Sequence, residues 1–228
     1  TVRVIPKLAN MVAISNKNFE SSTDKVAFNT NCPGIVVTTG TTKQDKTIIE
    51  PHTATNQTIL QKGFKTQNKI EWECALKIID NKEIKVWAGL KITNVQLMAT
   101  DTDQAFFKYQ RGDTDGDGIN KSQNLHFIYS VGGKDYSTDL GLFIDGTKIY
   151  RLKIVINKAK EVSVFVNEKQ YALTISEYTT GGRTESNINQ KSLPLSDAVL
   201  FPIIGVETGE DVIKTLEIYY QKISTELA

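Results

Sequence analysis

Hydrophobic and polar residues alternate with a period of two along most of this chain. In KIEWECALKI (69–78) the apolar side chains fall on one face and the charged side chains mostly on the other, as is typical of a half-buried β-strand. IKVWAGLKI (84–92) is a second segment of this kind and follows a polar turn. YRLKIVIN (150–157) and EVSVFVN (161–167) are predicted to pair as a hairpin across the polar segment KAK. These segments together indicate antiparallel β-sheet.

The last third of the chain continues the pattern. AVLFPIIGVE (198–207) is apolar almost throughout, so we expect both of its faces to be buried. Pro202 within it favours a bulge or an edge position, because proline has no amide proton for a ladder. KTLEIYYQKI (214–223) is predicted to be the last strand. Helical periodicity is suggested only by LANMVAISN (8–16).

The length of the chain fits a single domain. With 228 residues it can bury a substantial core, and one all-β domain of this size is ordinary. We find no internal repeat or linker after residue 30. The prediction is an all-β sandwich of two antiparallel sheets over residues 31–228, preceded by a short N-terminal arm or docking segment at residues 1–30.

Charge and hydropathy narrow the classes of partner. Lys and Arg number 27 and Asp and Glu 26, which gives a net charge of +1. A charge this small produces no overall electrostatic attraction to nucleic acid or to an anionic membrane. No apolar run is long enough to span a bilayer. The chain begins at Thr1 without a recognisable signal peptide, from which we expect synthesis in a cytoplasm. Partners of either the nucleic-acid or the membrane class are therefore not expected.

Two cysteines, Cys32 and Cys74, are too few for a disulfide scaffold and lack the spacing of metal ligands. Cys74 lies in an alternating apolar pattern, which favours a small buried hydrophobic residue. A bridge between the two is left open.

Candidate catalytic residues are sparse. His126 lies in NLHFIYSV and is interpreted as a strand residue, while His52 lies in EPHTATNQ without a serine or cysteine motif nearby. Glu71 and Glu73 alternate along one predicted strand, but no third acid completes the pattern of jelly-roll glycoside hydrolases. We interpret both as solvated charge on an outer face. The sequence thus predicts that the protein is not an enzyme.

The segment GDTDGDGIN (112–120) is the strongest candidate for metal binding. Asp113, Asp115 and Asp117 alternate and Gly118 follows, as at positions 1, 3, 5 and 6 of a calcium loop. Position 12 carries Asn124 instead of a bidentate glutamate, so an EF-hand is excluded. A calcium-clamped β-loop is one interpretation, with the missing ligand supplied from elsewhere, such as Asp101 or Asp103. The other interpretation is a hairpin tip whose aspartates bond their own backbone.

Several segments also carry a resemblance to a known family. They include VWAGLKITN (86–94), ATDTDQAFFKY (99–109), LHFIYSVGGKDYSTDLG (125–141) and VSVFVNEKQYAL (162–173). Together they resemble a group of bacteriophage virion proteins with a concanavalin A-like, laminin-G-like jelly-roll fold, over roughly residues 30 to 224. The group usually reads VNG where Glu168 follows Asn167 here, so a tight type I′ turn at that hairpin is not assured.

This resemblance implies a non-enzymatic structural protein of the virion, made in the host cytoplasm. It would be a capsid or tail decoration protein, a homo-oligomer or present in many copies, attached to other virion proteins. Calcium binding is not a general feature of the group, so the expectation that Ca²⁺ is bound depends on the acidic loop alone. The alternative is a lectin-like, carbohydrate-binding module that adheres to glycans. In that case Tyr109, Tyr136 and Tyr178 are candidate aromatic platforms.

Overall fold

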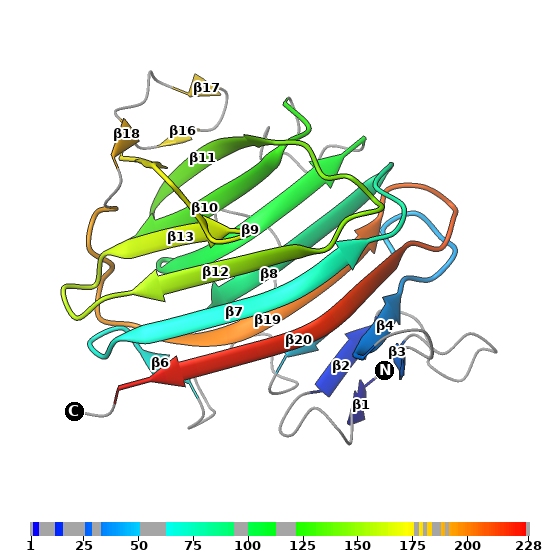
Figure 1. Ribbon diagram of the computed structural model, residues 1–228, viewed down its shortest axis with the longest axis horizontal. Helices are drawn as coiled ribbons and strands as arrows, with labels where there is room; N and C mark the ends of the chain where they lie inside the picture. Colours follow the sequence, from blue (N-terminus) through cyan, green and yellow to red (C-terminus); the bar gives the residue numbers. More distant parts are fainter. Residues whose placement is uncertain are drawn as a thin grey trace.

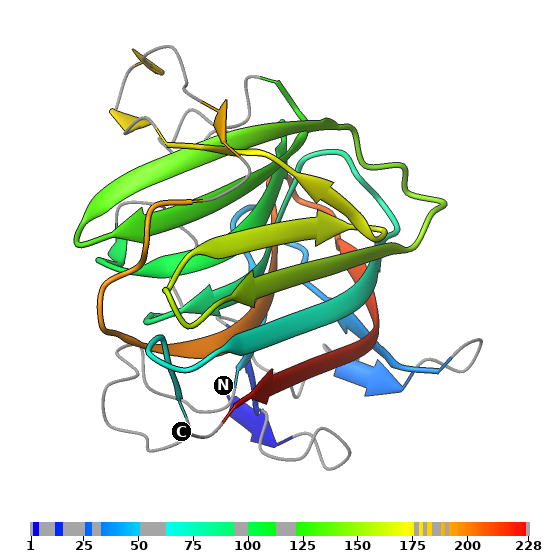
Figure 2. The ribbon, with the colours of Figure 1, turned by 60° about the vertical axis from the view of Figure 1, so that its left-hand side comes forward.

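A computed structural model describes most of the chain. The described residues are 2–4, 12–15, 26–28, 33–50, 63–93, 100–112, 122–175, 178–179, 182–183, 188–189 and 192–226. Within these ranges the structure is all-β, and two antiparallel sheets pack face to face (Figures 1 and 2). The predicted β-sandwich is confirmed. In the described part of the chain we find no helix long and apolar enough to cross a membrane.

The strands divide between two large sheets. The nine-stranded sheet runs in the order β1 (Val2–Val4), β2 (Val12–Ser15), β5 (Lys46–Glu50), β19 (Val199–Thr208), β8 (Ile84–Lys91), β9 (Gln104–Arg111), β10 (Leu125–Val131) and β11 (Lys134–Leu142), and β6 (Phe64–Lys65) also pairs with β19. The seven-stranded sheet runs β14 (Lys169–Tyr171), β13 (Val162–Val166), β12 (Tyr150–Ile156), β7 (Ile70–Ile78), β20 (Thr215–Thr225), β4 (Ile35–Thr38) and β3 (Val26–Phe28). Two short ladders pair β15 (Leu173–Thr174) with β18 (Ile188–Asn189), and β16 (Tyr178–Thr179) with β17 (Gly182–Arg183).

The main core lies between the two sheets and follows the alternation in the sequence. On β7 every apolar residue except Ala75 points inward, and Trp72 and Cys74 are completely buried. Cys74 has a free thiol, as expected for a small buried hydrophobic residue, and its burial raises the pKa of that thiol. A buried aromatic group of Phe107, Phe127, Tyr129 and Tyr136 fills the core under β9, β10 and β11. Pairs of this kind stabilise by more than their buried area alone.

The central strands of the nine-stranded sheet, from β5 to β10 in the sheet order, are also buried on their other face. A second apolar cluster lies there, composed of Ile48, Trp87, Phe106, Ile128 and Ile203. It is flanked by buried charges that are paired, since Lys85 Nζ lies 2.9 Å from Glu207 and Lys91 Nζ 3.2 Å from Asp101. Buried charges persist only when they are paired and hydrogen-bonded in this way. The expectation that both faces of segment 198–207 are buried is confirmed for β19.

Trp87 packs directly on a glycine of the neighbouring strand. Gly205 of β19 lies opposite Trp87 of β8, and a methyl group on Gly205 would overlap the six-membered ring of the indole. Glycine is therefore required here for close packing between the two strands.

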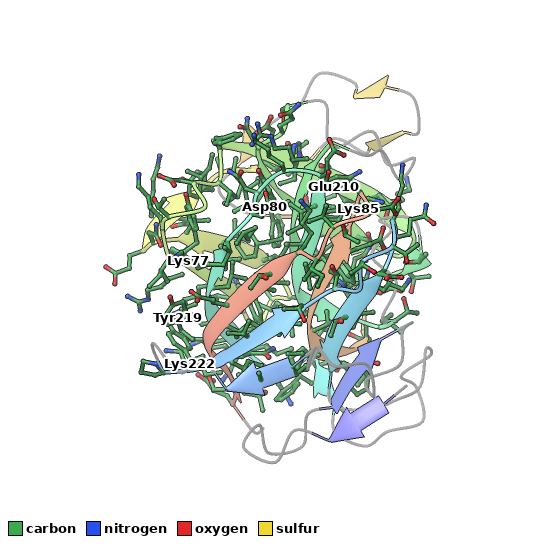
Figure 3. The ribbon with its side chains drawn as sticks, turned by 90° about the vertical axis from the view of Figure 1, so that its right-hand side faces the viewer. Lys77, Asp80, Lys85, Glu210, Tyr219 and Lys222 are labelled. Carbon is green, nitrogen blue, oxygen red and sulfur yellow. The ribbon has the colours of Figure 1, made fainter. Side chains whose placement is uncertain are left out.

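One end of the sandwich is held together by a buried lysine. Lys214 has no exposed side-chain area, and its Nζ lies 2.8 Å from Asp80 and 2.5 Å from Glu210. Its backbone pairs with Thr39, which follows β4. Asp80 belongs to the turn between β7 and β8 and Glu210 to the turn between β19 and β20, so one ammonium group joins turns that connect with both sheets (Figure 3). We call Lys214, Asp80 and Glu210 the lysine clamp.

Parts of the N-terminal segment extend both sheets. Strand β2 pairs with β5, and β3 pairs with β4. The helical periodicity of residues 8–16 is not realised at Val12–Ser15, which form a strand. Pairing with β5 overrides the weak helical pattern there, as tertiary context commonly does. The proposed docking role of residues 1–30 stays a prediction.

Candidate functional site

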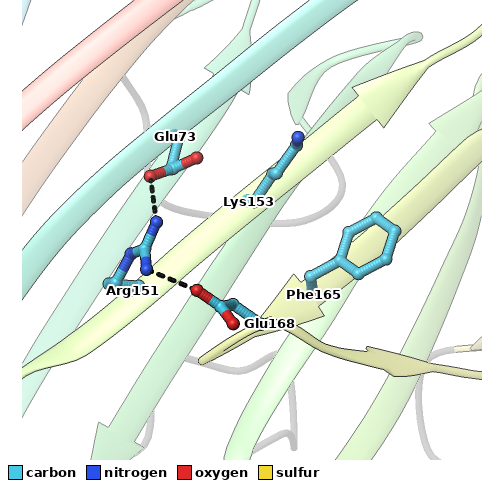
Figure 4. Close-up of a pocket in the computed structure, with 5 residues that line it drawn as sticks. All are labelled: Glu73, Arg151, Lys153, Phe165 and Glu168. Atoms are coloured by element: carbon cyan, nitrogen blue, oxygen red, sulfur yellow. Dashed lines mark hydrogen bonds and ion pairs between the residues drawn. The ribbon is translucent and has the colours of Figure 1, made fainter.

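A charged hollow opens on the outer face of the seven-stranded sheet, away from both cores. It measures about 300 Å³ and is lined by Glu73, Arg151, Lys153, Phe165 and Glu168 (Figure 4). These residues come from β7, β12, β13 and the turn that joins β13 to β14. A few convergent polar groups beside an apolar surface are typical of small-ligand sites. We refer to this feature as the Glu73 hollow.

Glu73 forms its floor. The side chain is only 7% exposed, which contradicts the prediction that Glu73 is solvated outer-face charge. Its carboxylate lies 3.3 Å from Arg151 Nη2 and 3.2 Å from Lys222 Nζ, and it accepts a hydrogen bond from the hydroxyl of Tyr220. Burial raises the pKa of Glu73, but the hydrogen bonds from Tyr220, Lys222 and Arg151 outweigh this and hold that pKa below its ordinary value. Glu73 is therefore an ionised acceptor.

Arg151 connects the floor of the hollow to its rim. Its Nη1 lies 2.7 Å from Glu168, its Nη2 contacts Glu73, and its Nε donates to the hydroxyl of Tyr220 at 3.2 Å. The pKa of Arg151 is raised by its hydrogen bonds to Tyr220 and Glu73. Because the planar guanidinium has these contacts on three sides, its orientation is fixed before any ligand arrives. Figure 4 shows it between the two carboxylates.

The rim residue Glu168 is held in a left-handed backbone conformation. Val166 pairs with Lys169, so Asn167 and Glu168 form a two-residue hairpin loop with φ values of 48° and 71°. Positive φ at both positions identifies the type I′ turn, which forms without the glycine that this turn usually requires. The side chain of Asn167 compensates by accepting a hydrogen bond from the backbone amide of Arg151 at 2.8 Å. Glu168 bears the conformational free-energy cost of this turn, because it is a bulky residue in a backbone conformation that favours glycine.

Lys153 and Phe165 complete the hollow on the side away from Glu168. Lys153 Nζ lies 3.0 Å from Glu71, which Lys69 also contacts at 2.8 Å. The hydrogen bonds from Lys69 and Lys153 lower the pKa of Glu71. Phe165 is partly exposed and lies opposite Lys153 on the next strand. Its ring offers the one large apolar surface among the residues that line the hollow.

This arrangement suits recognition of hydroxyl groups. Ionised carboxylates accept strong hydrogen bonds, and an oriented guanidinium and an ammonium donate them. A general acid in glycoside hydrolysis needs a raised pKa, whereas the pKa of Glu73 is lowered. The lowered pKa of Glu73 therefore does not match that of a general acid and fits an acceptor of hydrogen bonds.

The acidic calcium loop lies outside the described residues, which include neither Asp113, Asp115 nor Asp117. Its calcium binding stays a prediction. The suggested extra ligands are used elsewhere: Asp101 accepts hydrogen bonds from the backbone amides of Ile92 and Thr93 and pairs with Lys91, and Asp103 accepts from the amide of Ser196 at 3.0 Å. Among the described residues no group of three or more His, Cys, Asp or Glu side chains could hold a metal ion.

Two of the three tyrosines proposed as sugar platforms are buried. Tyr109 and Tyr136 point into the core and are 1% and 5% exposed, so this interpretation was wrong for both. Tyr178 lies in β16, but its side chain is outside the described part. His126 is confirmed as a strand residue of β10, with Ser122 Oγ 2.8 Å from its Nε2. His52 is not among the described residues.

Sequence reasoning missed Arg151, Tyr220, Phe165 and Glu168. Three of them lie at alternating, outward positions of strands that the sequence did predict. Alternation assigns Arg151 and Phe165 to the outer face, whereas Tyr220 faces outward because a β-bulge between Ile218 and Tyr220 shifts the register. Only the register between strands brings these residues beside Glu73. That register depends on long-range pairing, which a single sequence does not display.

Comparisons with known proteins bear on the fold. No known protein family matches the chain, and no curated protein matches it. Among solved structures, the carbohydrate recognition domain of Emp46p in its potassium-bound form superimposes with a TM-score of 0.56 at 9% identity, covering 97% of this chain and 91% of that one. An alginate lyase of family 7, A1-II′, gives a TM-score of 0.54 at 11% identity, with 90% and 85% covered. The β-glucanase of Bacillus licheniformis gives 0.53 at 9% identity, with 95% and 93% covered.

These similarities correct one prediction and confirm another. Because an alginate lyase and a β-glucanase have this fold, the prediction that the protein is not an enzyme is overturned. The shared architecture confirms the predicted fold: the chain is a concanavalin A-like jelly-roll β-sandwich of two antiparallel sheets.

Proposed function

We propose that this protein binds carbohydrate through the Glu73 hollow. The observation that carries the proposal is the convergence of an ionised, nearly buried carboxylate, an oriented guanidinium and a partly exposed aromatic ring on one open hollow. A sugar ring presents hydroxyl groups at its edge and C–H groups on its faces. The charged groups would meet the hydroxyls, and the ring of Phe165 would meet a C–H face.

The strained turn at the rim supports a functional role. Glu168 is held at a φ of 71°, although glycine would relieve that conformation. Backbone strain of this kind is found preferentially at functional sites, where the surrounding structure holds it in place. Here the strained residue supplies the carboxylate that contacts Arg151.

The fold similarity is consistent with this function but does not establish it. The neighbours include a carbohydrate recognition domain and two enzymes named for polysaccharides, all at about one-tenth identity or below in sequence. Their ligands are properties of those proteins.

A glycan array with the purified protein tests the proposal. We expect selective binding that Phe165→Ala and Arg151→Ala each weaken by about tenfold or more, as for residues at the centre of an interface. Ser163→Ala is the matched control, because Ser163 lies two residues from Phe165 on the same face of β13 and does not line the hollow. Equal binding by all four proteins, or no binding by the unaltered one, would refute the assignment.

The substitution Glu168→Gly is expected to have opposite effects on the free energy of unfolding, measured by urea denaturation, and on glycan binding, measured on the array. Glycine should relieve the left-handed conformation and raise the free energy of unfolding by about 1 kcal/mol. The loss of the rim carboxylate should weaken glycan binding. Gln44→Gly is the control, since Gln44 has a φ of 68° in a turn remote from the hollow. It should affect stability in the same direction without changing affinity.

The place of action is a separate proposal that rests on the sequence resemblance. We propose that the module is displayed in several copies on a virion, attached through residues 1–30 to capsid or tail subunits. Immunogold labelling of purified particles with antibodies against this protein tests it, and unlabelled particles would count against it.

A further inference from the structure

The Glu73 hollow lies in the middle of a row of outward-facing side chains that crosses five strands. Gln170 of β14 lies opposite Phe165 of β13, which lies opposite Lys153 of β12. Lys153 lies opposite Glu73 of β7, and Glu73 lies opposite Lys222 of β20. Neighbouring strands are about 4.8 Å apart, so the row extends for about 19 Å across the sheet. We call these five residues the transverse row.

The exposure of these residues gives the row the profile of a shallow trough. Glu73, the fourth of the five residues, has a side chain that is 7% exposed, whereas Lys153 before it is 35% and Lys222 after it 66% exposed. Gln170 at the other end is also exposed, and Phe165 is partly exposed. The deepest point therefore lies between two raised ends, and a single sugar ring would occupy only the centre.

The cationic side chains along this trough are paired. Arg151, Lys153 and Lys222 contact the carboxylates of Glu71, Glu73 and Glu168, and Lys69 also contacts Glu71. Each cation lies within 3.3 Å of at least one of these carboxylates. A carboxylate-bearing sugar would have to displace one of these ion pairs and would meet the remaining carboxylates, which costs electrostatic free energy.

From the length of the row and the pairing of its cations with carboxylates, we infer that the ligand is an uncharged, extended oligosaccharide that lies across the strands from β14 to β20. The inference rests on the proposed function, because it assigns the ligand class of the same hollow. Central units of the chain contact Glu73 and Phe165. Outer units contact Gln170 at one end and Lys222 at the other.

Isothermal titration with an oligosaccharide length series tests the inference. We expect affinity for a neutral glucan to rise by about tenfold or more from disaccharide to tetrasaccharide, as the outer positions fill. Binding should change little between low and high salt, because the ligand carries no charge. Uronate oligomers of the same lengths should bind more weakly.

Two variants locate the ends of the site. Gln170→Ala should weaken binding of the tetrasaccharide while leaving the disaccharide unchanged. Lys169→Ala is its control, because the neighbouring side chain lies on the other side of the same strand. An affinity that does not depend on oligosaccharide length would overturn the inference of an extended ligand, and a preference for uronates would overturn the inference of an uncharged one. Either result would leave glycan binding by the hollow intact. If no glycan of either class binds, the proposed function itself fails.

Discussion

Replacing both acidic members of the lysine clamp, in the variant Asp80→Asn/Glu210→Gln, is expected to lower the free energy of unfolding by about 3 kcal/mol. The reason is the position of Lys214, whose side chain has no exposed area and whose ammonium pairs with both of these carboxylates. Removing both leaves a buried charge without a counter-ion. Urea unfolding followed by circular dichroism measures the loss.

Adding Lys214→Met to that variant should restore most of the lost stability. Methionine replaces the unpaired ammonium with an apolar side chain of similar length, and such replacements of buried ion groups are often neutral or stabilising. Asp197→Asn is the control for an exposed pair, since Asp197 is 63% exposed beside Lys160, and it should lower the stability far less than the double substitution does. If the triple variant is no more stable than the double one, the buried ammonium is not the cause.

The clamp also makes stability depend on pH. Burial raises the pKa of Asp80, but the hydrogen bonds from Lys214 and from the backbone of Lys82 lower it below the ordinary value of 3.8. A carboxyl group with a lower pKa in the folded state stabilises the fold at pH values above its unfolded pKa. That contribution is lost as the pH falls through the folded-state pKa. The clamp should thus weaken in the acid range below about pH 3.8.

The substitution Gly205→Ala is expected to destabilise the protein by about 2 to 3 kcal/mol, the upper part of the usual range for overpacking. The added methyl group would overlap the indole of Trp87, which is completely buried. Thermal unfolding of the variant measures the cost.

A double-mutant cycle identifies the source of that cost. Trp87→Phe removes the indole atoms that the methyl group would meet. Gly205→Ala should therefore cost much less in the Trp87→Phe background than in the unaltered protein, with a coupling of about 1 kcal/mol or more. Additive effects would show that backbone strain, and not contact with Trp87, explains the loss.

The period of two was sufficient to predict the fold class. The segments at 69–78, 84–92 and 150–157 became β7, β8 and β12, and the hairpin from β12 to β13 forms as expected. Each depends on local alternation, which the sequence displays directly. The burial of both faces of β8 was not foreseen, because Lys85 and Lys91 look like solvent-facing residues until their partners Glu207 and Asp101 are placed beside them.

The candidate site was the least predictable feature. Glu73 and Arg151 are far apart in sequence and meet only through the pairing of β7 with β12. Glu168 was noted only as a departure from the expected turn, and its contact with Arg151 could not be read from the sequence. Residues of an outer face are chosen by function, so their pattern carries no packing constraint from which to infer their contacts.

The different burial of the two sheets has a consequence for how this protein can diversify. On β12 and β13 the inward and outward residues alternate between buried and partly exposed, so each strand separates the positions that hold the core from those that face solvent. Outward positions can be exchanged in combinatorial libraries, or by drift, at little cost to folding. On β8 and β9 almost every side chain is buried, and a change at nearly any position disturbs packing. New ligand preferences should therefore evolve on the seven-stranded sheet, while the nine-stranded sheet changes slowly as the conserved scaffold.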